Sequence, residues 1–175
     1  LVDAAPDVML PPGPNRVFIT AGFALGDFGG VAFADAMCAS EAAAAGLTGT
    51  FVAWLSTSTV DARDRLGSSR GWVRVDGVPV IDTVEAWLDR GQMFNPIDRD
   101  ATGVLRRSPI WTGSGPDGRV AMASTCNDWT QIFPSANLGE PTAAMPAFAE
   151  GFGWDCFYNG RFACFEVGLA SVVTP

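Results

Sequence analysis

Four cysteines constrain this chain more than any other feature of its sequence. They stand at Cys38, Cys126, Cys156 and Cys164, no two of them form a CxxC pair, and the chain contains no histidine. A zinc site built from thiolates usually shows two close pairs of ligands, and only Cys156 and Cys164 are close. Two disulfides are therefore the simplest interpretation, with four buried free thiols as the alternative. Spacing leaves three connectivities open, and disulfides indicate an oxidising compartment.

All 11 basic residues of the 175-residue chain are arginine. Without histidine there is no imidazole base or metal ligand and no catalytic triad of the usual kind. Without lysine there is no Schiff base and no P-loop lysine. The formal net charge of −8 would repel a phosphate backbone, so we expect no nucleic-acid partner. The 48% hydrophobic and 17% charged residues exclude disorder, and no apolar run is long enough to insert into a membrane.

The first part of the chain divides into a tail and three elements. Residues 1–15 hold four prolines, which predicts a linker of the kind that joins a domain to a lipid anchor or another module. The domain is expected over residues 16–175. Arg16–Thr20 is predicted as a strand and Ala21–Gly30 as a tight packing loop. The alanine-rich segment Val31–Ala45 is predicted as a helix that turns Cys38 inward.

The middle of the chain mixes strand and helix signals. We expect a strand or the end of a short helix at Phe51–Leu55, a hairpin at Gly71–Ile81, a helix at Asp82–Asp89 with Asp82 as its N-cap, and strands at Ile110–Gly113 and Arg119–Cys126. The 27 residues of Asn127–Gly153 show no periodicity, and a loop of that length usually signals function or internal packing. Arg161–Gly168 alternates as a last strand, so the layout is α+β with an antiparallel sheet.

The cysteine positions resemble the C-type lectin-like fold. That fold has a cysteine in a helix, a second at the start of a long loop, and W-D-C-x7-C followed by a glutamate, which here are Cys38, Cys126, Trp154-Asp155-Cys156, Cys164 and Glu166. The resemblance implies the pairs Cys38–Cys164 and Cys126–Cys156. It also implies a mixed, mostly antiparallel sheet with flanking helices and a long loop stapled by a disulfide.

A closer resemblance is to the endostatin-like branch, which includes the C-terminal domain of certain collagens and bacterial relatives. It is carried by Phe51–Ser58, Asp64–Leu66, Ile110–Arg119, Cys126–Trp129 and the final C-x7-C. Bacterial members are typically surface or secreted modules with no assigned activity. Animal members bind heparan sulfate through arginines, and some bind zinc through histidine. Since this chain has no histidine and is acidic, the zinc site is absent and heparin is disfavoured.

The C-type lectin resemblance also suggests a calcium site in the long loop. Gly139-Glu140-Pro141-Thr142 and Trp154-Asp155-Cys156 stand where lectins place their ligand motifs, although Thr142 replaces an asparagine and the second motif is shortened. Calcium prefers carboxylate and amide oxygens. The candidate ligands are Glu140, Asp155, Asn127 and Asp128. The alternative is that Glu140 is exposed while Asn127 and Asp128 satisfy backbone groups of a turn; no other cofactor is expected.

Aromatic residues are abundant around the same loop, in a chain with six tryptophans and twelve phenylalanines. Exposed rings would suit a glycan or a protein partner, whereas the alternative is a small core that holds the loop together. The candidate ligand-binding residues are Trp129, Phe133, Phe152 and Trp154, with Glu140 and Asp155. Nothing selects a carboxylate pair for hydrolysis, so we expect no enzyme.

These observations predict a secreted, periplasmic or cell-surface module of bacterial type that binds a glycan or a surface protein, as an adhesion module does. The alternative is a structural subunit of an extracellular or cell-envelope assembly that packs through its aromatic loop.

Overall fold

The computed structural model describes residues 12–121, 124–143, 148 and 152–175. The strands are β1 (Asn15–Ile19), β2 (Thr50–Ala53), β3 (Trp72–Arg74), β4 (Pro79–Ile81), β5 (Ile110–Trp111), β6 (Ser135–Gly139), β7 (Phe152–Asp155) and β8 (Ala163–Val167). The helices are α1 (Val31–Ala44), α2 (Val84–Arg90) and the single turn α3 (Cys126–Trp129), with a 3-10 turn at Asp64–Leu66.

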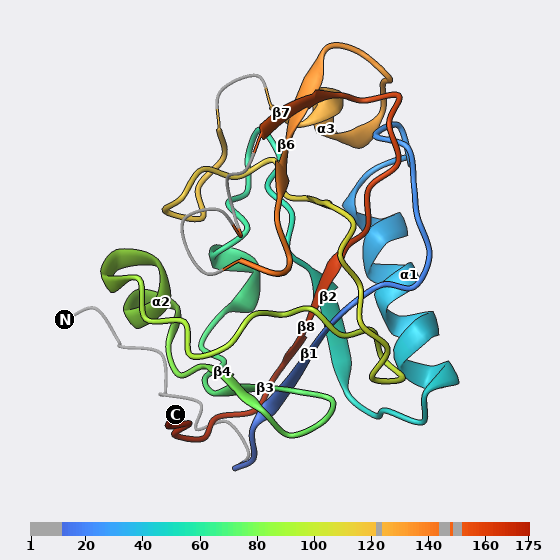
Figure 1. The fold of residues 1–175 in the computed structure, drawn as a ribbon. Coiled ribbons are helices and arrows are strands. Elements are labelled where there is room, and N and C mark those ends of the chain that lie inside the picture. Colours follow the sequence, from blue (N-terminus) through green and yellow to red (C-terminus); the bar gives the residue numbers. More distant parts are fainter. Residues whose placement is uncertain (1–11, 122–123, 144–147, 149–151) are drawn as a thin grey trace, which may run out of the picture.

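The strands form two sheets (Figure 1). The larger has the order β2-β8-β1-β3-β4, and the smaller the order β5-β6-β7. Strands β1 and β3 are parallel, and the other strand pairs are antiparallel. The expected α+β class with a mixed, mostly antiparallel sheet is thus confirmed.

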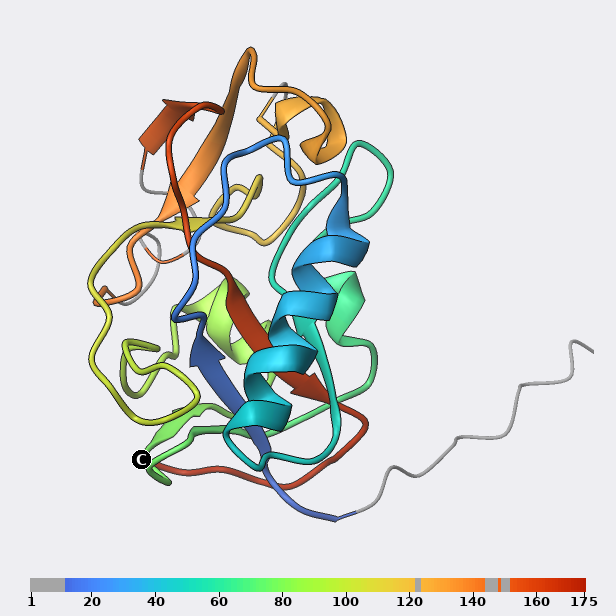
Figure 2. The same ribbon diagram turned by 90° about the vertical axis from the view of Figure 1, so that its right-hand side faces the viewer.

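Helix α1 covers one face of the larger sheet (Figure 2). It buries Ala34, Cys38 and Ala42, whose spacing places them on one side of a helix. Gly46 follows the helix with φ 74°, a conformation that glycine adopts at no steric cost. The predicted helix and the inward orientation of Cys38 are both confirmed.

Strand β8 separates two cores, because successive side chains of a strand point to opposite faces. Phe162 and Cys164 pack with the α1 side, whereas Ala163 and Phe165 pack with Trp87 of α2 on the other side. Glu166, the next residue of β8, is 2% exposed and forms an ion pair of 2.7 Å with Arg16. Both faces of the larger sheet are therefore covered.

The predicted N-cap of α2 was wrong. The N-cap of α2 is Thr83, whose hydroxyl accepts from the N–H of Ala86, and not Asp82. Asp82 instead binds Arg70 at 2.7 Å and accepts from the N–H of Val173, because the ion pair and this backbone donor hold it outside the helix.

The elements around the long loop also differ from those that its sequence predicts. The described residues of Arg119–Cys126, which are 119–121 and 124–126, do not form the expected strand: Val120 and Thr125 make isolated bridges to Ser114 and Ala136, and Cys126 already begins α3. Strand β6 lies inside the supposedly aperiodic Asn127–Gly153 segment. Strand β2 resolves the open choice at Phe51–Leu55, and β1 begins at Asn15, one residue before its predicted start. Among the helices of the described residues, none has the length and apolar character that crossing a membrane requires.

Candidate functional site

Both disulfides implied by the cysteine pattern are present. Cys38–Cys164 joins α1 to β8 with a Cα–Cα distance of 5.5 Å, and Cys126–Cys156 joins α3 to the turn after β7 at 5.8 Å. Gly26 packs on the second disulfide, where an added Cβ would lie 2.5 Å from the Sγ of Cys126. This close approach confirms that the glycine-rich segment is a packing loop.

The turn α3 is left-handed throughout. Cys126, Asn127, Asp128 and Trp129 have φ values of 49°, 52°, 54° and 66°. Each non-glycine residue in this conformation costs about 1–2 kcal/mol, somewhat less for Asn and Asp. Such a backbone persists only where surrounding contacts fix it, and strained segments of this kind gather at functional sites.

Four hydrogen bonds hold the turn in place. The carboxylate of Asp128 accepts from the N–H and the hydroxyl of Ser58, both at 2.6 Å, and from the hydroxyl of Thr125 at 3.3 Å. The indole of Trp129 donates to the carbonyl of Ser56 at 2.9 Å. Hydrogen bonds from Ser58 lower the pKa of Asp128 below its ordinary value. The turn is therefore fixed to a loop far away in sequence.

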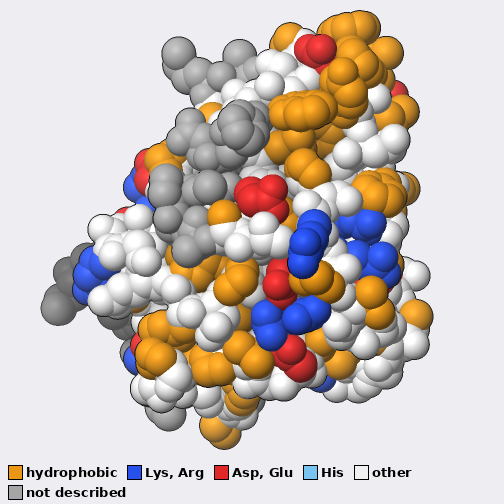
Figure 3. All heavy atoms as spheres, viewed as in Figure 1, with side chains coloured by type: hydrophobic (Ala, Val, Ile, Leu, Met, Phe, Trp, Pro, Cys, Tyr) orange, Lys and Arg blue, Asp and Glu red, His pale blue; other side chains and the backbone are white. Residues whose placement is uncertain are grey.

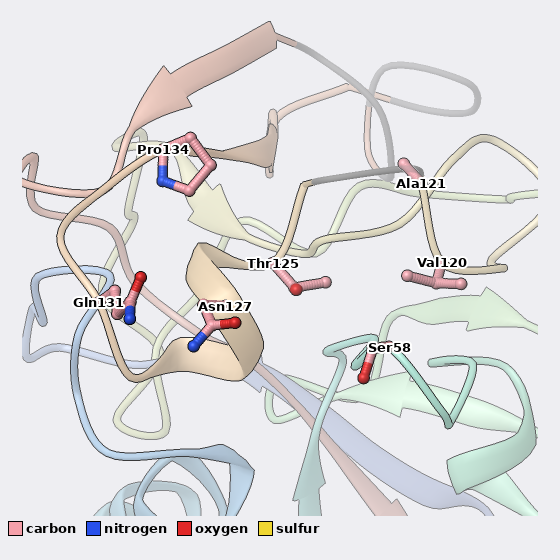
Figure 4. Close-up of a pocket in the computed structure, with 7 residues that line it drawn as sticks. All are labelled: Ser58, Val120, Ala121, Thr125, Asn127, Gln131 and Pro134. Atoms are coloured by element: carbon pink, nitrogen blue, oxygen red, sulfur yellow. The ribbon is translucent and has the colours of Figure 1, made fainter.

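A pocket of about 450 Å³ lies beside this turn (Figure 4). Gln131 and Pro134 stand on one side of it, and Val120 and Ala121 on the other. Its described lining is Ser58, Val120, Ala121, Thr125, Asn127, Gln131 and Pro134. None of these seven residues is charged, and four carry a hydroxyl or amide. The volume is within the range of small-molecule sites.

A cluster of exposed aromatic rings, here called the aromatic surface, lies at the end of the smaller sheet where β6 begins and β7 ends (Figure 3). Phe133, Trp154, Phe157 and Tyr158 are 59%, 39%, 43% and 43% exposed, and Ile132 adds an aliphatic side chain. The ring centroids of Phe133 and Phe157 are 6.0 Å apart, those of Phe157 and Tyr158 4.6 Å, and those of Trp154 and Tyr158 4.7 Å. The rings therefore form one continuous patch.

The predicted aromatic residues divide between this surface and the core. Phe133 and Trp154 are exposed as a ligand-binding role requires, but Trp129 is fully buried against Phe28 and Trp111, so it offers no free face. The expectation that Trp129 contacts a ligand is corrected on this ground. The side chain of Phe152 lies outside the described part of the structure.

The predicted calcium ligands are not gathered into a metal site. Glu140 accepts from the hydroxyl of Thr142 at 2.7 Å within its own turn, and Asp155 is exposed on β7. Asn127 and Asp128 share α3, where Asp128 is engaged by the donors described above. Over the described ranges of the chain, no three Asp, Glu or Cys side chains lie close enough together to hold a metal ion.

Sequence reasoning missed Ile132, Phe157 and Tyr158 on the surface and Gln131 in the pocket. A signal was present: Phe157 and Tyr158 directly follow a disulfide cysteine and precede Asn159-Gly160, a turn dipeptide. Bulky rings in such a tight turn have little core to enter. Comparison with known proteins adds no assignment, because no protein-family model matches the chain and no curated protein matches it significantly.

Proposed function

We propose that this chain is a non-catalytic binding module of the C-type lectin-like, endostatin-like type that recognises an uncharged glycan in an oxidising compartment. The observation that carries the proposal is the uncharged pocket beside α3 (Figure 4). The two disulfides support a secreted, periplasmic or cell-surface location. None of the described lining residues has a side chain suited to acid–base catalysis.

The hydrogen-bonding groups of the pocket match sugar hydroxyls. Ser58 and Thr125 give their hydroxyl hydrogens to Asp128, so the oxygen of Ser58 can accept from a ligand, and that of Thr125, which already accepts from the N–H of Asp128, keeps one lone pair. Asn127 donates one amide hydrogen to Thr130, which leaves its second hydrogen and its oxygen available. Gln131 is exposed, and its amide adds two donors and an acceptor. A sugar hydroxyl is both donor and acceptor, so it can satisfy either kind of group.

The remaining lining favours the same ligand class. Val120, Ala121 and Pro134 offer apolar contact to the C–H face of a sugar ring. A wholly apolar ligand would leave the amides without partners, at a cost of about 1–3 kcal/mol for each group. An ionic ligand would find no opposite charge among the described lining residues. A neutral polyhydroxyl compound fits both requirements.

The proposal is tested by saturation-transfer NMR with the methyl glycosides of glucose, galactose, mannose and N-acetylglucosamine, up to about 20 mM. We expect saturable binding of at least one of them. Asn127→Gly keeps the left-handed backbone and removes the amide, and Gln131→Ala removes the second amide. Each change should weaken binding about fivefold, the usual value of one hydrogen bond.

The matched control is Gln92→Ala, which removes an exposed glutamine that does not line the pocket. It should leave binding unchanged. Absence of binding by all four glycosides, or equal weakening by the control, would overturn the assignment. A preference for methyl glucuronide over the neutral sugars would do the same.

A further inference from the structure

The aromatic surface wraps around the edge of the smaller sheet. Ser135 of β6 pairs with Asp155 of β7. Phe133 stands two residues before Ser135, Phe157 stands two residues after Asp155, and their rings are in contact. Asp155 ends β7 directly after Trp154, and the turn that follows it carries Phe157 and Tyr158, with the N–H of Tyr158 donating to the carbonyl of Asp155 at 3.1 Å. Trp154 and Tyr158 form the second half of the surface, and the contact between Phe157 and Tyr158 joins the halves.

The surface is acidic as well as aromatic. Asp155 is exposed, and Asp27 is exposed next to Gly26, whose N–H donates to the carbonyl of Cys156 at 2.6 Å. Among the ion pairs of the described residues, none involves either carboxylate. On the face drawn in Figure 3, the visible arginines lie away from this end of the molecule. The whole chain carries a formal net charge of −8, which has the same sign as these two carboxylates.

The rings are set at angles to one another. Trp154 and Tyr158 meet at 82°, and Phe133 and Phe157 at 60°. The π-face of an exposed ring attracts a cation, and an exposed carboxylate nearby adds to the attraction.

We propose that the aromatic surface docks a basic protein segment, with arginine or lysine side chains placed over the rings and beside Asp155. Charge complementarity selects this occupant. A second copy of the chain would bring another net charge of −8 to the same interface, which opposes self-association. The inference goes beyond glycan binding and rests on residues that do not line the pocket.

The first test uses the fluorescence of Trp154. It is the exposed tryptophan of the six in the chain, because Trp54, Trp72, Trp87, Trp111 and Trp129 are fully buried. The quenching constants of caesium and of iodide are measured at equal ionic strength. Each is divided by the constant for free N-acetyltryptophanamide. A negative surface should favour caesium, and Asp155→Asn should reduce that preference. Equal quenching, or a preference for iodide, would overturn the acidic character on which the inference depends.

The second test measures binding of a capped peptide of alternating arginine and glycine by calorimetry. A glutamine–glycine peptide of equal length is the neutral control. We expect binding of the arginine peptide alone, weakened at least tenfold as salt rises from about 50 to about 500 mM. Phe157→Leu keeps apolar area but removes the ring, and should weaken binding about three- to fivefold.

Phe33→Leu is the matched variant, since Phe33 is 46% exposed on α1 and its ring contacts Phe28, which is not part of the aromatic surface. It should not change binding. Equal binding of the glutamine peptide, or no effect of Phe157→Leu, overturns the proposal. So does a dimer in sedimentation that Phe133→Ser abolishes, which would assign the surface to self-assembly. Asn127→Gly should leave peptide binding intact, so failure here is distinguishable from failure of the glycan assignment.

Discussion

Replacing Asp128 with asparagine tests whether a distant loop holds the left-handed turn. The four residues of α3 together cost at most about 4–8 kcal/mol relative to relaxed backbone, since Asn127 and Asp128 cost less than the other two. The carboxylate of Asp128 offsets part of this through two bonds from Ser58 and one from Thr125. Asparagine has one acceptor oxygen, and its amide nitrogen cannot accept from either Ser58 donor.

The loss is therefore about one charge-assisted hydrogen bond, or about 2 kcal/mol. For a chain of this length that corresponds to a fall in Tm of about 4–8 °C. Differential scanning calorimetry at pH 7 measures it, with Asp64→Asn as the matched control because Asp64 is exposed on the 3-10 turn. A variant as stable as the wild type would refute the view that Asp128 fixes the turn.

The same carboxylate gives the prediction a pH dependence. Ser58 lowers the pKa of Asp128, so its contribution to stability is fully present above the ordinary carboxyl pKa of about 4 and is lost as pH falls through the lowered folded-state value. The difference in Tm between wild type and Asp128→Asn should shrink below about pH 4. A difference that grows on acidification would contradict the assigned sign.

Three other outcomes follow from the structure. Gly26→Ala places a Cβ 2.5 Å from the Sγ of Cys126, so we expect a loss of about 1–3 kcal/mol in thermal unfolding, and an unchanged Tm would show that this contact is relaxed. Replacing Cys126 and Cys156 together with serine opens a loop with a sequence separation of 30 and should cost about 3–4 kcal/mol in denaturant unfolding; a loss below 1 kcal/mol would mean that the reduced loop stays closed. Calcium and EDTA should give the same Tm, because the candidate ligands are not clustered; a rise in calcium that Glu140→Gln removes would restore the metal site.

Much of the larger sheet and its helices could be predicted because local signals agreed with the final packing. The alanine-rich α1, the alternation of β8 and the glycine that ends α2 in a left-handed conformation are all visible in the sequence. The disulfide pairing came from the cysteine pattern of a resembling fold, since spacing left it open. Thr83 and Asp82 are adjacent capping residues, and distant contacts of Asp82 with Arg70 and the N–H of Val173 decide between them.

The candidate sites were harder because distant contacts determine them. Asn127 and Asp128 tolerate left-handed backbone, but Ser58, 70 positions from Asp128, fixes them there. Trp129 and Trp154 have the same local character in sequence, yet one fills the core and the other is exposed. The difference arises because the indole of Trp129 reaches the carbonyl of Ser56, a partner that no local pattern reveals.

The division between the two sheets explains why both proposed binding surfaces lie at one end of the molecule. Both faces of the larger sheet are covered by core, so its side chains are committed to stability. The smaller sheet has β7 at its edge, and the rings on and after β7 have no second layer to enter. The Cys126–Cys156 disulfide then holds the pocket turn and the aromatic turn to one another. Rigidity there is supplied by covalent and tertiary links, which leaves the exposed side chains available for binding.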